Sequence, residues 1–298
     1  MKMNSFGKTI LGVSITLFIF YIIFQKVSLQ DLISVLENVN PCYLTLSLFP
    51  LIISLYFIAK RWQTLLSAMG YTISLTKCFF VIMASFPLIS ITPSKTGDFV
   101  RAYYLKDEIP MTKTIGSVLT EKIFDVITLI VFSLVGMVYY KIYDFLWLLI
   151  IFFIFLLMAI VVIKKGRGLH ISALWHDRIQ NVAFSMRCLS ENNNLFIRTT
   201  AYSLAIWLLA ILQVLIFFYA LHIDVDILYL FAMLPLAIFI GMLPVSIGGM
   251  GTRDAAIIFL FSDYGTASEL LAVGILFSLF RYWLLSISGL PFMRKMSL

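Results

Sequence analysis

The chain has 298 residues, of which 61% are apolar and only 12% carry a formal charge. A typical soluble domain is about 45–50% apolar and about 25% charged, so this chain lacks the charged residues that a water-exposed surface needs. The composition excludes a soluble enzyme, a nucleic-acid-binding domain and a disulfide-stapled secreted domain. The net charge of +7 must therefore be placed relative to a membrane before a polyanionic partner is inferred from it.

Apolar runs recur from end to end of the chain, and most have the length of a membrane-spanning helix. The sequence predicts six full transmembrane helices, at Thr9–Phe24, Tyr43–Ala59, Thr114–Tyr140, Phe145–Ile163, Thr199–Leu221 and Leu270–Leu290. The first run follows two lysines, as a signal peptide does, but no small-residue cleavage site follows it, so we expect it to be retained. The expected fold is one all-α, polytopic membrane domain over residues 1–298.

Two further segments predict helices that do not cross the membrane. The apolar runs Phe79–Thr92 and Ala255–Phe261 are too short for about 30 Å of hydrocarbon, which needs roughly 20 residues of helix. Each lies beside a stretch interrupted by glycine and proline, and Ala255–Phe261 follows the apolar run Ile227–Leu243. These patterns predict two re-entrant helical hairpins, which enter the bilayer and return to the same side.

The distribution of Lys and Arg predicts the orientation, because cytoplasmic loops carry an excess of them. With both termini inside and both hairpins returning to their own sides, seventeen of the 22 Lys and Arg residues are cytoplasmic. The outer loops then keep Lys26 and Lys141 and hold seven acids. If Phe79–Thr92 crossed fully, the six cations of Lys164–Arg198 would lie outside, which opposes the rule. We expect a multi-pass protein of the cytoplasmic (inner) cell membrane with cytoplasmic N- and C-termini.

Residues 166–194 predict an amphipathic segment on the cytoplasmic side. Their apolar members recur at intervals of four and three residues, at Trp175, Ile179, Val182, Met186 and Leu189. This spacing indicates a helix lying on the membrane surface, where anionic lipid meets the excess of positive charge. A solvated connector is the alternative. Nucleic acid is not needed to explain the charge, so no nucleic-acid partner is expected.

The sequence shows no motif for a metal, a cofactor or an enzyme. Its three cysteines form no C-x-x-C pair, and its three histidines lack the spacing of metal ligands. It has no nucleophile elbow and no Walker lysine. The glycines of Gly248–Gly251 lie between apolar helices, unlike a dinucleotide-binding motif, which follows a strand. We therefore expect no cofactor and a transporter rather than an enzyme.

The two predicted hairpins share a sequence pattern. Each has Pro-x-x-x-Gly with an arginine eight or nine residues after the proline, from Pro93 to Arg101 and from Pro244 to Arg253. The two copies are predicted to enter from opposite sides of the membrane. That arrangement is typical of an inverted repeat, which many transporters share. Chance similarity between two loops is the alternative.

A helix that restarts after such a loop is suited to binding an anion. Its first turn, near Thr96 or Thr252, presents unpaired N–H groups and a positive dipole end, and glycine lets the backbone come close to a ligand. Arg101 and Arg253 each add a charged donor, unless they only snorkel to the surface. The predicted substrate-binding residues of the two loops are Gly97, Asp98, Arg101, Gly248, Gly249, Gly251 and Arg253.

A third group of charged residues lies within a predicted span. Glu121 and Asp125 share a helix face at i, i+4, and Lys122 is expected to reach Asp125 at i+3. Charges at this depth are costly, so we expect all three to line a wet cavity as substrate-binding residues. An internal ion pair that only holds helices together is the alternative. Arg281, in the last span, is expected to be the counter-charge for this group or for a ligand.

At these residues the sequence resembles the flippase-like membrane domain of lysylphosphatidylglycerol synthases, which also occurs as a stand-alone membrane protein. The resemblance covers nearly the whole chain. Its marks are Arg61-Trp62, Pro93-x-x-x-Gly97-Asp98-x-x-Arg101, Glu121-Lys122-x-x-Asp125 and Pro244-x-Ser246-x-Gly248-Gly249-x-Gly251-x-Arg253-Asp254. The family more often has Arg where Lys122 stands and Glu where Asp254 stands, which leaves the geometry of those two contacts open.

The resemblance implies a flippase-like protein that moves a membrane lipid with a phosphate headgroup, an anionic phospholipid or a polyisoprenyl phosphate, between leaflets. Full-length synthases carry a soluble aminoacyl-transfer domain after the membrane part, and none follows here before Leu298. The resemblance therefore implies translocation rather than aminoacylation. Two alternatives stay open: a membrane-embedded transferase with Glu121 or Asp98 as base, and a non-catalytic subunit that recruits a soluble synthase. A homo-oligomer is also left open.

Overall fold

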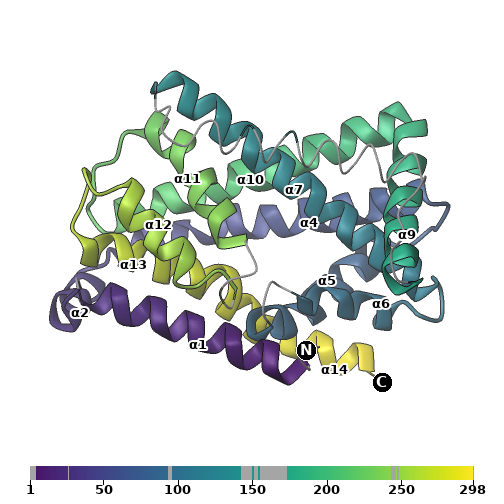
Figure 1. The fold of residues 1–298 in the computed structure, drawn as a ribbon, viewed down its shortest axis with the longest axis horizontal. Helices are drawn as coiled ribbons and strands as arrows, with labels where there is room; N and C mark the ends of the chain where they lie inside the picture. The colour runs from purple at the N-terminus through teal and green to yellow at the C-terminus, as the bar shows by residue number, and fades with distance from the viewer. Residues whose placement is uncertain are drawn as a thin grey trace.

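The computed structural model describes residues 5–25, 27–92, 96–141, 150, 154, 173–242, 246 and 248–297, with the backbone alone for 5–12, 173–178 and 297. Within these ranges every regular element is a helix, as the sequence predicts (Figure 1). Nearly all of the predicted span Phe145–Ile163 lies outside the described residues. So do Pro93 and Pro244, the prolines of the two predicted hairpin loops.

Four long apolar helices have the length and composition of membrane spans. They are the continuous α3 and α4 (Pro41–Leu46 and Leu48–Ala68), α7 (Met111–Tyr139), α10 (Asn193–Ala220), and the last span made of α13 (Ala267–Ser278), η2 (Leu279–Leu284) and α14 (Leu285–Ser297). The first helices, α1 (Ser5–Phe24) and α2 (Leu29–Glu37), add a fifth span if they count together, although the chain bends by 88° between them. The chain is a multi-pass membrane protein, while the number of six full spans stays a prediction.

Shorter helices connect these spans. They are α5 (Leu75–Ile91), η1 (Thr96–Phe99), α6 (Val100–Tyr104), α9 (Ala173–Glu191), α11 (Ile227–Met242) and α12 (Thr252–Leu260). Several helices begin where a side chain satisfies a free backbone N–H. Asn40 accepts from the backbone of Cys42 at 3.0 Å before α3, and Thr266 and Glu269 cap each other at the start of α13.

Two of the shorter segments fold back on themselves. After α5 the chain returns through η1 and α6, and an ion pair between Lys77 and Glu108 joins the beginning of α5 to the residues after α6. After α11 it returns through α12, and the Tyr229 hydroxyl donates to the Leu260 carbonyl at 2.8 Å. Each segment therefore begins and ends at the same end of the molecule, which is the geometry of a helical hairpin.

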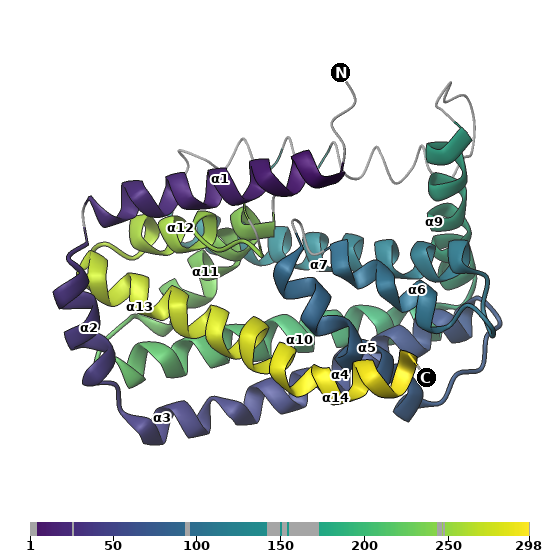
Figure 2. The ribbon, with the colours of Figure 1, turned by 90° about the horizontal axis from the view of Figure 1, so that it is seen from below.

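The spans of the two halves of the chain pack side by side and antiparallel. At one end of the α4–α10 contact, the Asn40 N–H donates to the Ala220 carbonyl at 2.9 Å. Farther along, Arg61 Nη1 donates to Ser203 Oγ at 3.1 Å. A residue late in α4 thus meets one early in α10. Figure 2 shows these two helices running along each other through the bundle.

The remaining major helix contacts follow one rule. We define the first unit as α4, the α5–α6 hairpin and α7, and the second unit as α10, the α11–α12 hairpin and α13–α14. In the most extensive contacts, α4 packs on α10, α5 on α14 and α7 on α11. Exchanging the two units leaves the α4–α10 pair unchanged and turns the α5–α14 pair into the α11–α7 pair. An inverted repeat would produce this pairing.

The α9 helix lies across one end of the bundle (Figures 1 and 2). Its apolar residues Val182, Met186 and Leu189 are buried against Leu65 of α4 and Phe124 of α7. The described part of the predicted amphipathic face therefore packs on protein rather than on lipid. The position of α9 relative to the membrane stays a prediction.

The two ends of the bundle differ in charge. At one end, Tyr140, Tyr229 and Tyr264 pack ring against ring, and the Tyr140 hydroxyl donates to Asp226. We call this the acidic end, because its described charged residues include Asp224, Asp226, Asp263 and Glu269. The opposite, basic end holds Lys77, Lys106, Lys113, Arg187 and Lys295. Tyrosine at a helix end and such a charge difference are typical of the two faces of a membrane protein.

Candidate functional site

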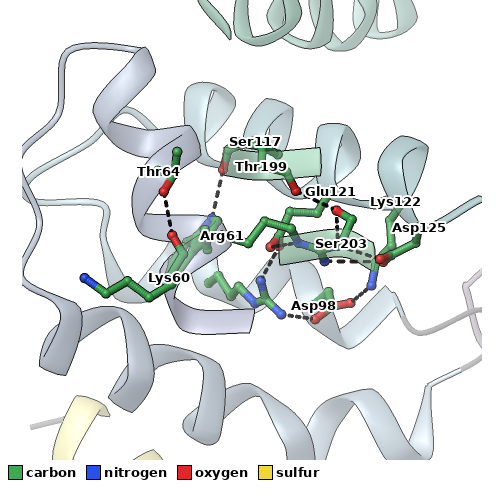
Figure 3. A network of polar contacts seen from close by, with 12 residues as sticks. Lys60, Arg61, Thr64, Asp98, Ser117, Glu121, Lys122, Asp125, Thr199 and Ser203 are labelled. Carbon is green, nitrogen blue, oxygen red and sulfur yellow. Dashed lines mark hydrogen bonds and ion pairs between the residues drawn. The ribbon is translucent and has the colours of Figure 1, made fainter. Parts of the chain in front are cut away.

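Six charged side chains from four helices form one buried network (Figure 3). They are Arg61 of α4, Asp98 of η1, Arg101 of α6, and Glu121, Lys122 and Asp125 of α7. Five of them are at most 6% exposed, and the Lys122 side chain is 33% exposed. Three cations and three carboxylates are present, so the formal charge of the network is zero.

Glu121 lies at the centre of the network because two arginines share its carboxylate. Arg61 Nε donates to one oxygen at 3.3 Å, and Arg101 Nη1 donates to the other at 2.7 Å. Arg101 Nη2 also donates to Asp98 at 2.7 Å, and Lys122 pairs with the second oxygen of Asp98. The network therefore ties the tip of the first hairpin to the middle of α7.

Asp125 connects the same network to α10. It accepts from Arg61 Nη1 at 2.6 Å and from the indole N–H of Trp207 at 3.0 Å. On the other side, the Arg101 guanidinium lies 5.2 Å from the centre of the Trp62 ring. Because five of the six charges are buried, removal of one buried partner leaves the other unbalanced, which typically costs about 3–5 kcal/mol.

A second group of polar side chains surrounds Arg253 in the first turn of α12. Arg253 is 2% exposed. Its Nε and Nη2 donate to Asp254 Oδ1 at 3.1 and 2.6 Å, and Nη2 also reaches the Gly274 carbonyl and Ser278 Oγ. Its Nη1 is buried and has no hydrogen-bond partner in the part of the chain that the structure describes. One N–H group of the guanidinium is therefore available to a ligand.

Arg281 lies beside this group, on the π-helical turn η2 that interrupts the last span. Its Nε donates to the side-chain oxygen of Gln213 at 2.8 Å, and its buried Nη2 has no partner among the described residues. The guanidinium carbons of Arg253 and Arg281 lie 4.3 and 5.7 Å from the centre of the same Phe277 ring. Single π-helical turns within α-helices are frequent at functional sites.

Glycines let both hairpin tips pack closely against their own hairpins. A Cβ on Gly97 would overlap the backbone of Leu88 in α5, and one on Gly249 would overlap the carbonyl of Gly241 in α11. Gly249 also has a φ of +77°, in the left-handed region that favours glycine. The two tips are thereby held inside the bundle.

The α12 helix begins at Thr252, but the Thr252 hydroxyl does not cap it and instead contacts Ser246 Oγ at 2.8 Å. The side chain of Asp254 instead accepts from the backbone N–H of Gly251 at 2.9 Å. A carboxylate in the first turn also suits the positive end of the helix dipole. The η1 helix begins at Thr96, as predicted.

One cavity of about 120 Å³ connects the two groups. The predicted residues that line it are Asp98, Arg101, Glu121, Lys122, Asp125, Gly248, Gly249, Arg253 and Arg281, while Gly97 and Gly251 do not. A water molecule takes up about 30 Å³ in the liquid, so the space suits a phosphate group or a few waters.

Two partner assignments from the sequence differ in the structure. Lys122 pairs with Asp98 and not with Asp125, because the first hairpin brings Asp98 next to α7. The counter-charges of Glu121 and Asp125 are Arg61 and Arg101, whereas Arg281 contacts Gln213, so its role as the counter-charge of a ligand stays a prediction. The sequence analysis named Arg61 as a mark of the resemblance but not as a site residue, because the predicted span ended at Ala59, whereas α4 continues to Ala68.

This fold and this site define a class: a multi-pass helical membrane protein with a charged cavity enclosed between two helical hairpins. The chain belongs to the family described as lysylphosphatidylglycerol synthase TM region, whose sequence model matches residues 9–289. A UPF0104 membrane protein of Methanocaldococcus jannaschii is 31% identical over 127 residues, which are 41% of this chain and 38% of that protein. A UPF0104 membrane protein of Methanothermobacter thermautotrophicus is 24% identical over 288 residues, 85% of each chain.

Proposed function

We propose that this protein moves a lipid with a phosphate headgroup between the two leaflets of the membrane. The headgroup passes through the cavity between the hairpins while the hydrocarbon tail stays in the lipid. The observation that carries the proposal is that Arg253 Nη1 and Arg281 Nη2, like Arg101 Nε, are buried donors without a partner in the described part of the chain. Leaving a buried donor without an acceptor costs about 1–3 kcal/mol, and more for a charged group. An anionic ligand would supply the missing acceptors.

A phosphate fits these donors better than a simple point charge does. A guanidinium presents parallel N–H groups that match two oxygens of a phosphate. The α12 N-terminus adds its dipole, and Gly248 and Gly249 bring the loop backbone to the cavity wall. Within the same cavity, the Arg61–Glu121 network offers charged and polar groups to the hydroxyls of a headgroup.

We further propose that transport exploits an inverted repeat. The two hairpins begin at opposite ends of the bundle, and their tips meet at one cavity. Movement of one unit against the other would open this cavity to one leaflet at a time. The sequence contains no nucleotide-binding motif, so we propose that transport is passive or coupled to an ion.

The transferase alternative has less support from the geometry. Glu121 and Asp98, the two candidate bases, are each engaged by two cations. A carboxylate held in this way is poorly placed to take a proton from a substrate. The subunit alternative rests on the basic end of the bundle, which suits a soluble partner with an acidic surface.

Reconstitution into liposomes tests the proposal. A phospholipid that carries a fluorophore on its acyl chain is placed in both leaflets, and a membrane-impermeant quencher reports how fast the inner pool reaches the outside. We expect wild-type protein to accelerate this exchange and Arg253→Ala to slow it. Exchange no faster than in protein-free liposomes would contradict the proposal. A chemically altered lipid would support the transferase, and co-purification of a soluble enzyme would support the subunit.

A further inference from the structure

The two halves of the cavity differ in how their charges are balanced. On the side of the first unit, each of the three carboxylates is bonded to at least one of Arg61, Arg101 and Lys122. This side is electrically neutral without a ligand. On the side of the second unit, Arg253 is paired with Asp254, but Arg281 has no carboxylate partner among the described residues. Among the residues that the structure describes, one positive charge is therefore in excess around the cavity.

The residue that leaves the charge of Arg281 unbalanced is Gln213, which is fully buried. Its side-chain oxygen accepts from Arg281 at 2.8 Å, and its amide nitrogen donates to the Ser47 carbonyl at 3.2 Å. Gln213 is on the first span of its unit and contacts the last one, just as Arg61 on α4 contacts Asp125 on α7. A neutral amide thus stands where a carboxylate would cancel the charge of Arg281.

We propose that the cavity selects lipids whose headgroup carries one negative charge and no ammonium group, and that Gln213 sets this preference. This inference rests on the proposed function and specifies its substrate class. A phosphodiester has a single charge and two non-bridging oxygens, which match one excess charge and the two unsatisfied donors of Arg253 and Arg281. A phosphate monoester carries about −1.5 to −2 charges at pH 7 and overshoots this balance.

A headgroup with an ammonium group meets an opposite problem. It adds a positive charge to a cavity that already has one in excess. The cavity carboxylates that could balance this charge are already bonded to cations of the protein. An ammonium group would therefore compete with an existing ion pair for its carboxylate. A neutral hydroxylated headgroup brings no such competition.

Binding to the purified protein in a non-ionic detergent tests the selectivity directly. The probes are short-chain phosphatidylglycerol, phosphatidic acid, phosphatidylethanolamine and lysyl-phosphatidylglycerol, measured by calorimetry. We expect phosphatidylglycerol to bind at least ten-fold more tightly than the two lipids with an amine and more tightly than phosphatidic acid. Equal affinity for phosphatidylglycerol and lysyl-phosphatidylglycerol would overturn the inference.

The role of Gln213 is tested by Gln213→Glu, which places a carboxylate against Arg281 with almost no change in shape. We expect phosphatidylglycerol to bind at least ten-fold more weakly and the preference over phosphatidylethanolamine to disappear. The matched control is Gln63→Glu on α4, where the amide donates to the Ile73 carbonyl outside the cavity. The control should keep the wild-type preference.

A second variant, Arg281→Gln, removes the excess cation itself instead of adding a carboxylate beside it. It should cause the same loss of phosphatidylglycerol binding and of the preference over phosphatidylethanolamine. It decides the question if Gln213→Glu does not fold, because it does not disturb the bond to Ser47. Wild-type preference in a folded Arg281→Gln protein would overturn the inference. Selective binding of phosphatidylglycerol without any translocation would instead refute the proposed function and leave the selectivity standing.

Discussion

At the scale of single residues, the network around Glu121 shows why charges are retained inside an apolar bundle. Glu121 and Asp125 are one helical turn apart on α7, and both contact Arg61. The pattern of two carboxylates at i, i+4 therefore predicts a shared face, but it contains no information about which cation lies opposite. The same ion pairs hold helices together and form the cavity wall. The two interpretations of these residues, cavity lining and helix packing, therefore do not exclude each other.

Replacing Arg61 by methionine should destabilise the protein. The change leaves the carboxylates of Glu121 and Asp125 with one cation fewer, and we expect a loss of about 3–5 kcal/mol. Thermal unfolding in detergent, followed by tryptophan fluorescence, measures the effect. The control is Lys60→Met, because the contact of Lys60 with a described side chain is a long one, 3.5 Å to Gln63. Equal stability of the two variants would contradict a structural role for the network.

Replacing Arg253 by lysine should preserve the fold and weaken the site. The ammonium group can pair with Asp254, but it has no second, coplanar nitrogen in the place of Arg253 Nη1, which has no partner among the described residues. We expect the binding of a phospholipid probe to fall by about 1–3 kcal/mol, the range for a hydrogen bond to a charged group. Arg198→Lys, at an exposed position, is the control. Unchanged affinity in Arg253→Lys would remove the two-pronged contact from the proposal.

At the scale of elements, the local sequence predicts where a helix breaks, but it does not predict which helices come into contact. The glycines near Gly97 and Gly249 predict where the chain turns, and the turns lie there. The surfaces that these turns pack against depend on distant segments. Gly136 of α7 illustrates this, because a Cβ there would overlap the backbone of Ala232 on α11.

The contact between α7 and α11 predicts an unusual response to Gly136→Ala. Alanine favours an isolated helix by about 1 kcal/mol over glycine. Here we expect a net loss of stability of about 1–3 kcal/mol, because the added methyl group pushes the two helices apart. Val135→Ile adds a methyl group at the preceding residue, which is 67% exposed, and should leave the unfolding temperature unchanged. A more stable Gly136→Ala protein would show that α7 and α11 are not closely packed.

At the scale of the whole molecule, the acidic and basic ends support the predicted orientation. The two hairpins begin at opposite ends, and the spans of the two units pair antiparallel across the bundle. Because cytoplasmic loops carry an excess of Lys and Arg, we expect the basic end to lie on the cytoplasmic side.

Labelling of single cysteines from outside intact cells tests this orientation. After replacement of Cys42, Cys78 and Cys188, cysteines introduced at the exposed positions Asp224 and Asp263 should react with an impermeant maleimide. Cysteine at Lys106 should react only after the cells are opened. External labelling at Lys106 would show that the orientation is the reverse of the predicted one, with the α5–α6 hairpin entering from the outside.

The sequence alone determined the all-helical membrane class, the approximate limits of the long helices and most of the charged residues of the cavity. These features follow from the length of apolar runs, from breaks at glycine and from the cost of charges in lipid, which are all local properties. Only the tertiary structure decided which charges meet. The partners Arg61 and Asp125 are 64 residues apart, and Arg281 and Gln213 are 68 residues apart. Such pairs depend on how antiparallel helices align along their length, and no local pattern encodes that alignment.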